Sequence, residues 1–355
     1  MANGTHSDTV AEVVVISSTS AKKRKRGLKK RLILVLRIVW FTFLYLLWPL
    51  FRRILKPAVV FFVYPGKPSD KYAYFTPWME RHFRAVFPLG VLKFNGRWGI
   101  VGAKPITTAE MDVKSSLALT TMDQIQKEFP LAVTVALAGR FPGYVHRAHG
   151  KFLPPFVEGT TGTVFAMISA AKALARKKSM PPSVLNIAVL GGAGVVGSQL
   201  VDYLGQIFGS VIAFDPRYTD EKMSKRTLFT SQPERLCEAD VAIVLTAEGD
   251  QVAKLAPYFT EGTVIADDTH PCMYKATRDE FTTRGCDLWK VTMEGDLLMI
   301  PRLPNFEPSD IPGCLVEAIT VAIAGWGALD TQHAFNEAAA NIGFKTKLYR
   351  HPDED

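Results

Sequence analysis

Cysteine is scarce in this sequence of 355 residues, and acidic residues are missing from one long stretch of it. The four cysteines show neither a C-x-x-C spacing nor a pairing with histidine of the kind that binds zinc, so the sequence predicts no metal site. Four cysteines in a chain of this length also do not make a disulfide framework, which is typical of a protein from a reducing compartment.

The stretch without Asp or Glu runs from 21 to 57 and carries twelve of the 42 Lys and Arg residues. The whole chain has 34 Asp and Glu and a formal net charge of +8, so outside this stretch 30 basic residues face 34 acidic ones and the net charge is −4. The basic character is therefore local, and a nucleic-acid-binding protein is excluded because its basic surface would extend over the folded domains.

The same stretch contains the longest apolar run of the chain. Residues 32–51 are long enough to cross a bilayer and have one charge, Arg37. Basic residues lie on both sides of this run, which favours contacts of residues 22–56 with anionic lipid headgroups. We therefore expect a membrane-associated protein with its catalytic part on the cytosolic face, and a transmembrane, re-entrant or interfacial anchor are all compatible with the pattern.

From residue 181 onward, apolar strands alternate with helices. Strands are predicted at 184–190, 210–214, 241–245 and 263–266, with a helix at 198–208 after the first of them. This alternation predicts an α/β fold with a doubly wound parallel sheet of the Rossmann type, beside a second α/β domain that binds the substrate. The predicted parts are a disordered tail at 1–21, a membrane anchor at 22–64, the N-terminal part of the substrate domain at 65–180, the Rossmann domain at 181–300 and C-terminal helices at 301–355.

The second domain is less regular in sequence. Helices are predicted at 70–87 and 109–128, followed by a buried strand at 131–137. A turn with the sequence GTTGT at 159–163 opens a long apolar helix that ends near residue 178.

A glycine-rich loop follows the first strand of the Rossmann pattern. Gly192, Gly194 and Gly197 have the G-x-G-x-x-G spacing, and Asp215 stands 18 positions after the last of them. In this context the motif predicts a site for a dinucleotide, whose pyrophosphate binds at the start of the next helix. The predicted cofactor-binding residues are Gly191, Gly192, Ala193, Gly194, Val195, Val196, Gly197, Asp215, Arg217 and Thr246.

The choice between NAD and NADP is left open by the residues that follow. Asp215 favours NAD because a carboxylate accepts hydrogen bonds from a ribose 2′-hydroxyl. Basic residues that would hold a 2′-phosphate instead come directly after it, namely Arg217, Lys222, Lys225 and Arg226. We expect NADP(H), with NAD(H) not excluded.

Cys314 lies at the start of a predicted helix that reaches about Trp326. Asp310 is expected to cap this helix and Pro312 to lie in its first turn. The helix dipole would then lower the pKa of the Cys314 thiol, which suits a nucleophile. Glu317, one turn further, would exchange protons with a reacting group or support the cap.

Three blocks of the chain resemble the long-chain acyl-acyl carrier protein reductases known best from cyanobacteria. They are the turn at 159–163 with its helix, the glycine loop at 187–198, and the helix that starts at Cys314 with the final helix that ends at 343–344. The resemblance extends from about 134 to 348, and Gly162 departs from it because the cyanobacterial enzymes have a histidine there. It implies that Cys314 attacks an acyl thioester and that NADPH then delivers a hydride, which releases a fatty aldehyde.

The resemblance also implies where the substrate binds. The predicted catalytic residues are Cys314, Glu317 and His270, with His270 as a proton donor, and the predicted substrate residues are Gly159, Thr161, Gly162 and Thr163. The leading hypothesis is reduction of fatty acyl carrier protein or fatty acyl-CoA through an acyl-cysteine. Two alternatives are a reductase of another carbonyl or imine without covalent catalysis, and a non-catalytic membrane protein that senses a nucleotide.

Overall fold

The computed structural model describes residues 35–36, 39–40, 42–44, 46–66, 71, 75, 77–82, 85–269, 272–300 and 309–350. The chain divides into two compact units, Met1–Leu47 and Trp48–Asp355. The described residues of the first unit are helical. The second unit contains two sheets, and it carries all the sites discussed below.

The first sheet has six strands in the order β13-β2-β3-β1-β4-β5. Their bounds are β1 Val59–Val63, β2 Phe87–Phe94, β3 Arg97–Ala103, β4 Thr134–Leu137, β5 Phe156–Val157 and β13 Leu297–Ile300. Strands β3, β1, β4 and β5 are parallel, while β2 and β13 add an antiparallel edge. The helices near this sheet are α3 Pro77–His82, α4 Thr108–Val113, α5 Ser116–Glu128 and α6 Phe141–Arg147.

Two helix predictions for this region are wrong in their extent. The helix expected at 70–87 is α3 alone in the described residues, and β2 begins at Phe87. The helix expected at 109–128 is divided into two helices. A capping box formed by Thr107 and Glu110 starts α4, and α4 ends before Ser115, the residue that precedes α5. The strand expected at 131–137 is confirmed as β4, in a shorter form.

Strand β1 corrects the predicted membrane anchor. It lies in the middle of the first sheet, paired with β3 on one side and β4 on the other. Its residues Val59 to Phe62 are at most 1% exposed. A strand that is buried on both faces is apolar throughout, and this explains why it resembles a membrane segment in sequence.

The residues just before β1 also pack on the folded unit. Trp48 is buried and its ring lies 5.1 Å from that of Phe129, centroid to centroid. Arg52, which was expected to contact lipid headgroups, forms an ion pair with Glu128 of α5 at 2.8 Å.

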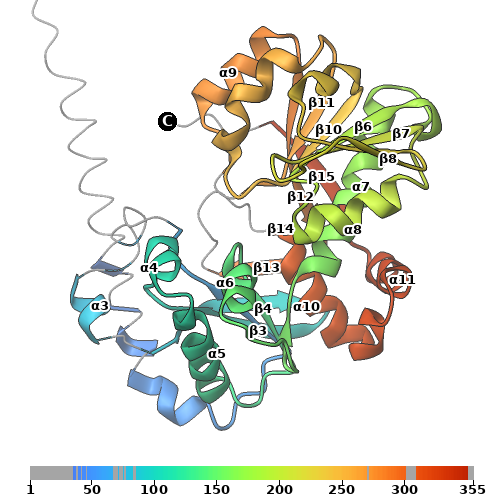
Figure 1. The fold of residues 1–355 in the computed structure, drawn as a ribbon. Coiled ribbons are helices and arrows are strands. Elements are labelled where there is room, and N and C mark those ends of the chain that lie inside the picture. Colours follow the sequence, from blue (N-terminus) through green and yellow to red (C-terminus); the bar gives the residue numbers. More distant parts are fainter. Residues whose placement is uncertain are drawn as a thin grey trace, which may run out of the picture. The chain divides into compact units, whose positions relative to one another are not determined.

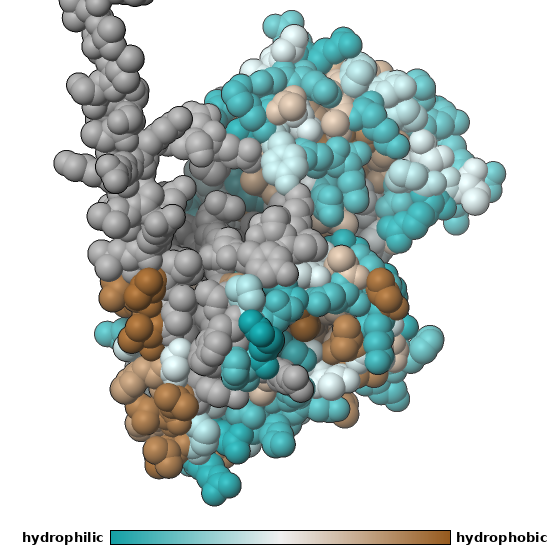
Figure 2. Space-filling model, turned by 90° about the vertical axis from the view of Figure 1, so that its left-hand side faces the viewer, coloured by the Kyte–Doolittle hydropathy of each residue, from teal (hydrophilic) through white to brown (hydrophobic). Residues whose placement is uncertain are grey.

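Among the described residues, we find no helix whose length and apolar character would allow it to cross a membrane. The predicted membrane association, with the lipid partner and the cytosolic-face location that followed from it, is wrong for this part of the chain. The basic cluster at 22–31 lies outside the described residues. Leu50, Phe51 and Ile54 do expose apolar side chains, and Figure 2 shows apolar surface gathered at one edge of the molecule.

The second sheet confirms the predicted doubly wound fold. Its order is β14-β12-β11-β10-β6-β7-β9-β8, with β15 also paired to β12. The path β9-β7-β6-β10-β11-β12 is parallel and has the order 3-2-1-4-5-6 when its strands are renumbered along the chain, which is the order of dinucleotide-binding sheets. The strands are β6 Asn186–Leu190, β7 Ser210–Phe214, β8 Lys222–Ser224, β9 Thr227–Thr230, β10 Val241–Val244, β11 Val264–Asp267, β12 Asp287–Glu294, β14 Asp310–Ile311 and β15 Lys345–Tyr349.

Helices and 3-10 turns complete this half of the unit. The helices are α7 Thr160–Lys177, α8 Val195–Leu204, α9 Lys275–Thr283, α10 Gly313–Ala324 and α11 Gln332–Ile342. The 3-10 turns are η1 Pro182–Val184, η2 Pro233–Glu238, η3 Gly249–Tyr258 and η4 Trp326–Leu329.

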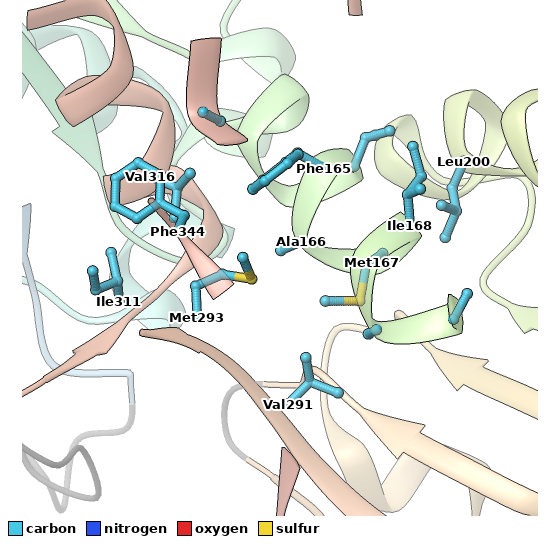
Figure 3. Packing of buried hydrophobic residues seen from close by; sticks show 14 of the residues in the cluster. Phe165, Ala166, Met167, Ile168, Leu200, Val291, Met293, Ile311, Val316 and Phe344 are labelled. Carbon is cyan, nitrogen blue, oxygen red and sulfur yellow. The ribbon is translucent and has the colours of Figure 1, made fainter. Parts of the chain in front are cut away.

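Helix α7 connects the two halves of the second unit. It packs against α10 near the first sheet and against α8 and strands β10 to β12 of the second sheet, as Figure 1 shows. Figure 3 shows how its side chains are enclosed, with Leu200 of α8 on one side and Met293 of β12 and Val316 of α10 on the other. A helix buried on almost all its faces is apolar all round, as the sequence of α7 is.

Candidate functional site

The glycine loop connects β6 to α8, and its glycines are required by close packing. Gly191 has a positive φ of 97°. A Cβ on Gly192 would lie 3.1 Å from Cβ of Ala213 in the neighbouring strand β7, and a Cβ on Gly197 would collide with the carbonyl oxygen of Gly191. The loop therefore lies directly over the carboxyl ends of β6 and β7.

The start of α8 fits the pyrophosphate of a dinucleotide. Gly194 is the residue before the helix, and no side chain of the described residues caps it. The N–H groups of Val195, Val196 and Gly197 are in the first turn, where an α-helix leaves N–H groups without intrahelical partners. Together with the close glycine packing, these N–H groups make a cradle for an anion.

Asp215 follows β7, but its carboxylate faces the protein. Oδ2 accepts the N–H of Ala193 at 3.1 Å, and Arg217 donates to both oxygens, through Nε at 2.9 Å and Nη2 at 2.8 Å. Burial would raise the pKa of Asp215, yet the Arg217 and Ala193 donors hold the pKa below its ordinary value. The expected hydrogen bond from a ribose hydroxyl to Asp215 does not fit this arrangement, because the carboxylate oxygens already accept from Arg217 and Ala193.

Thr246 comes after β10 on the same edge of the sheet. Its hydroxyl donates to the carbonyl oxygen of Glu248 at 2.8 Å, so it shapes the turn that follows the strand. Its predicted contact with the cofactor stays a prediction.

Cys314 lies in the first turn of α10, as predicted, but the predicted cap is wrong. Pro312 is the residue before the helix, whereas Asp310 belongs to β14 and forms an ion pair with Lys347 at 2.9 Å. The backbone N–H groups of Gly139 and Leu315 favour the charged form of the Cys314 sulfur and so lower its pKa.

The predicted low pKa of the Cys314 thiol is also wrong. Burial, together with the carboxyl groups of Glu317 and Asp268, raises its pKa to about 12, although the backbone N–H groups of Gly139 and Leu315 oppose the rise. Desolvation and negative charge near the sulfur therefore outweigh the helix dipole. A thiol with this pKa is uncharged at neutral pH and is a poor nucleophile.

Glu317 binds the start of α7. Its Oε1 accepts the N–H of Gly159 at 3.0 Å and its Oε2 accepts the N–H of Gly162 at 2.8 Å. Burial raises its pKa, although the same N–H groups oppose the rise. Of the two roles considered for Glu317, the support of a helix start is the one that the geometry shows, although the supported helix is α7.

The GTTGT turn is a packing contact between α7 and α10. A Cβ on Gly159, which has a φ of 86°, would lie 2.7 Å from Cβ of Cys314, and a Cβ on Gly162 would collide with the carbonyl oxygen of Gly313. Thr163 donates to the carbonyl oxygen of Gly159 at 2.7 Å, and the carbonyl oxygen of Thr161 accepts from Gln332. Gly162 is buried in this contact, and the substrate roles of the four residues stay predictions.

His270, the predicted proton donor, lies outside the described residues. The residue that sequence reasoning missed is Asp268, two positions earlier and directly after β11. Burial raises the pKa of Asp268 to about 7, and Asp267 raises it while the ammonium of Lys290 lowers it. The two consecutive carboxyl groups after a buried strand were the available signal for this residue.

Tyr64 is the second missed residue. It follows β1, and a Cβ built on Gly139, which follows β4, would lie 3.6 Å from its hydroxyl oxygen. Burial raises the pKa of Tyr64, and Cys314 is close enough to raise it too. Tyr64, which follows a strand of the first sheet, and Asp268, which follows a strand of the second, are therefore both within electrostatic range of Cys314.

No protein family matches the chain, and no curated protein matches it by sequence. Several solved structures are similar to large parts of it, at low TM-scores. A D-lactate dehydrogenase from Treponema pallidum is 13% identical over 80% of this chain and 94% of its own, with a TM-score of 0.34. A D-isomer specific 2-hydroxyacid dehydrogenase from Lactobacillus delbrueckii ssp. bulgaricus, in an NAD-complexed form, is 11% identical over 80% of this chain and 94% of its own, with a TM-score of 0.33.

A probable 2-hydroxyacid dehydrogenase from Rhizobium etli, in complex with NADP, is 13% identical over 66% of this chain and 81% of its own, with a TM-score of 0.30. These TM-scores are low, so the fold assignment depends on the strand order of the chain itself.

The predicted family is not borne out. The similar structures are named as 2-hydroxyacid dehydrogenases and not as acyl carrier protein reductases, so they lend no support to the predicted membership, to the predicted reduction of a fatty acyl thioester or to the predicted acyl carrier protein or acyl-CoA partner. The raised pKa of the Cys314 thiol also opposes the predicted acyl-cysteine chemistry. The coarser prediction of an oxidoreductase agrees with these names. The predicted cofactor, NADP(H) with NAD(H) not excluded, agrees with them as well.

Proposed function

We propose that this chain is an NAD(P)H-dependent oxidoreductase that reduces the carbonyl group of a small substrate without a covalent enzyme intermediate. The observation that carries the proposal is the position of Asp268. It stands at the carboxyl end of β11, on the same edge of the parallel sheet as the glycine loop, and it acts electrostatically on Cys314. Ligands of doubly wound sheets bind outside this edge, where the strand order reverses.

The residues of the loop would hold the cofactor. The N–H groups at the start of α8 would bind the pyrophosphate, and the packed glycines allow it to approach the backbone. When bound, the dinucleotide supplies the hydride. In this sheet the strand order reverses between β6 and β10. Strands β10 and β11 therefore lie on one side of this reversal point, and β7 with Asp215 lies on the other.

Asp268 would supply the proton. As the hydride adds to the carbonyl carbon, the electron pair of the C=O double bond moves to the oxygen, and the Asp268 carboxyl group protonates that oxygen. Asp268 is left as a carboxylate and regains its proton from water. A pKa near 7 suits this role in both directions, because both forms of the acid are populated at neutral pH.

The surroundings of Cys314 favour a role without covalent catalysis. Its raised pKa keeps the thiol protonated, although nearby backbone N–H groups oppose the rise. Tyr64, which is within electrostatic range of Cys314, keeps its phenol protonated and adds an O–H donor. These groups would orient a polar substrate.

The test compares single-turnover and steady-state oxidation of NADPH and NADH by the wild type, Asp268→Asn and Cys314→Ala. The substrate panel contains 2-oxo acids, simple ketones and cyclic imines. We expect turnover with one of these classes, a loss of at least about 100-fold in Asp268→Asn and a change below about tenfold in Cys314→Ala. Full activity in Asp268→Asn, or complete loss in Cys314→Ala with the fold intact, would contradict the proposal.

A further inference from the structure

The structure assigns Arg217 as the residue that selects a dinucleotide with a 2′-phosphate, with Asp215 as its fixed support. This inference depends on the proposed function, because it concerns the same dinucleotide site. It resolves the choice between NADP(H) and NAD(H) through the local geometry after β7.

The carboxylate of Asp215 has no capacity left for a ribose. Oδ1 accepts the backbone N–H of Arg217 at 3.0 Å and its Nε at 2.9 Å, while Oδ2 accepts from Nη2 of Arg217 and the N–H of Ala193. Two carboxylate oxygens have about four acceptor sites, and these four bonds use them. The side chain is also 5% exposed, so a 2′-hydroxyl cannot reach it without breaking these contacts.

Arg217 faces outward from the same point. Its side chain is 64% exposed although it is held at both Nε and Nη2. A Cβ built on Gly194 would lie 3.9 Å from Nη2, so the guanidinium lies beside the glycine loop. A guanidinium fixed by a carboxylate behind it loses little conformational freedom when it binds a phosphate in front.

The register of the neighbouring strands excludes two of the other basic candidates. Strand β9 runs parallel to β7, with Val211 paired to Thr227 and Phe214 to Thr230. Lys225 and Arg226 form the turn that leads into β9, and the carbonyl oxygen of Arg226 accepts the N–H of Val211. They therefore lie at the amino end of β7, on the opposite edge of the sheet from Asp215.

Lys222 is the remaining candidate. It pairs with Phe229 and so lies near the carboxyl end of β9, on the same edge as Arg217. It is one strand further from the glycine loop, because β9 separates β8 from β7. We assign it a supporting role in the positive potential of this edge.

The experiment measures binding of the adenosine half alone, which separates the inference from catalysis. The probes are 2′,5′-ADP and 5′-AMP, titrated by calorimetry into the full chain. The wild type is expected to bind 2′,5′-ADP at least about tenfold more tightly than 5′-AMP. Arg217→Ala should abolish this preference while changing the affinity for 5′-AMP less than about threefold, and Arg217→Lys should keep part of it.

Lys225→Ala is the matched control, since it removes one positive charge from the opposite edge, and it should leave both affinities unchanged. Equal affinity of the wild type for the two probes, or equal losses for both in Arg217→Ala, would overturn the inference. These binding results do not depend on whether a carbonyl substrate is reduced. A failure of the proposed function is recognised in a different experiment, the turnover assay with NADPH and NADH.

Discussion

The carboxylate of Glu317 on α10 accepts the backbone N–H of Gly162 on α7 at 2.8 Å. This contact joins the second turn of α10 to the first turn of α7, through residues that are 155 positions apart in sequence. It is possible because Gly162 has no side chain, so that α10 can approach the α7 backbone directly. The position of Cys314, one turn before Glu317, is set by the same contact.

The close approach predicts a stability cost at Gly162. In Gly162→Ala, the added methyl would overlap the carbonyl oxygen of Gly313 and the Cβ of Glu317, so the helices must separate. We expect a loss of about 1 to 3 kcal/mol in the free energy of unfolding, measured by urea denaturation. Gly143→Ala on α6 is the control, because nothing lies within 4 Å of its added methyl. A neutral Gly162→Ala would show that the helices are not in tight contact.

We expect the negative charge of Glu317, and not only the shape of its side chain, to contribute to the stability of the folded protein. Glu317→Gln would replace one acceptor oxygen by an NH₂ group that faces backbone N–H donors, and it would remove a negative charge from the start of α7. Thermal and urea unfolding should show a loss of roughly 1.5 to 3 kcal/mol. Glu337→Gln, at an exposed pair with His333, should change stability by less than about 0.5 kcal/mol. Similar values for the two variants would contradict the buried role of Glu317.

The raised pKa of Asp268 predicts that the stability of the folded protein depends on pH. Its pKa is about 7 in the folded protein against an ordinary value of 3.8, so the folded state binds more protons than the unfolded state between these values. Its contribution to stability is therefore full at pH values below about 4, declines as the pH rises towards 7, and is constant above that. The groups that act on this carboxyl are Asp267 on β11, Lys290 on β12 and Cys314 on α10.

Melting temperatures of the wild type and Asp268→Asn between pH 4 and pH 8 test this dependence. The stability of Asp268→Asn relative to the wild type should increase across this range, because the amide has no proton to lose. A difference between the two proteins that stays constant with pH would show that Asp268 has an ordinary pKa.

Cys314 is expected to react slowly with alkylating reagents. Burial and the nearby carboxyl groups keep its thiol protonated at pH 8, whereas Cys237 is exposed. Iodoacetamide labelling at pH 8, followed by peptide mass spectrometry, should therefore modify Cys237 well before Cys314 in the folded protein. In guanidinium chloride the two rates should become similar. Preferential labelling of Cys314 in the folded state would restore the reading of this residue as an activated nucleophile.

The Rossmann half could be predicted from sequence because its signals are local. Strand β6, the glycine loop and α8 follow one another without interruption, and the close packing of Gly192 and Gly197 involves residues of the same βαβ unit. The first sheet gave no such signal. Strand β1 is apolar on both faces and follows a long apolar run, so hydropathy alone did not separate it from a membrane segment.

The sequence by itself determined the doubly wound sheet, the anion-binding loop and the position of Cys314 at the start of a helix, because these depend on neighbours in the chain. The tertiary structure alone decided the chemistry. It places the half-buried Cys314 near the carboxyl groups of Glu317 and Asp268, turns the carboxylate of Asp215 towards Arg217, and brings Asp268 and Tyr64, which follow strands of different sheets, within electrostatic range of Cys314. Protonation states and hydrogen-bond partners depend on burial and on charges that are distant in sequence, and a local pattern does not contain them.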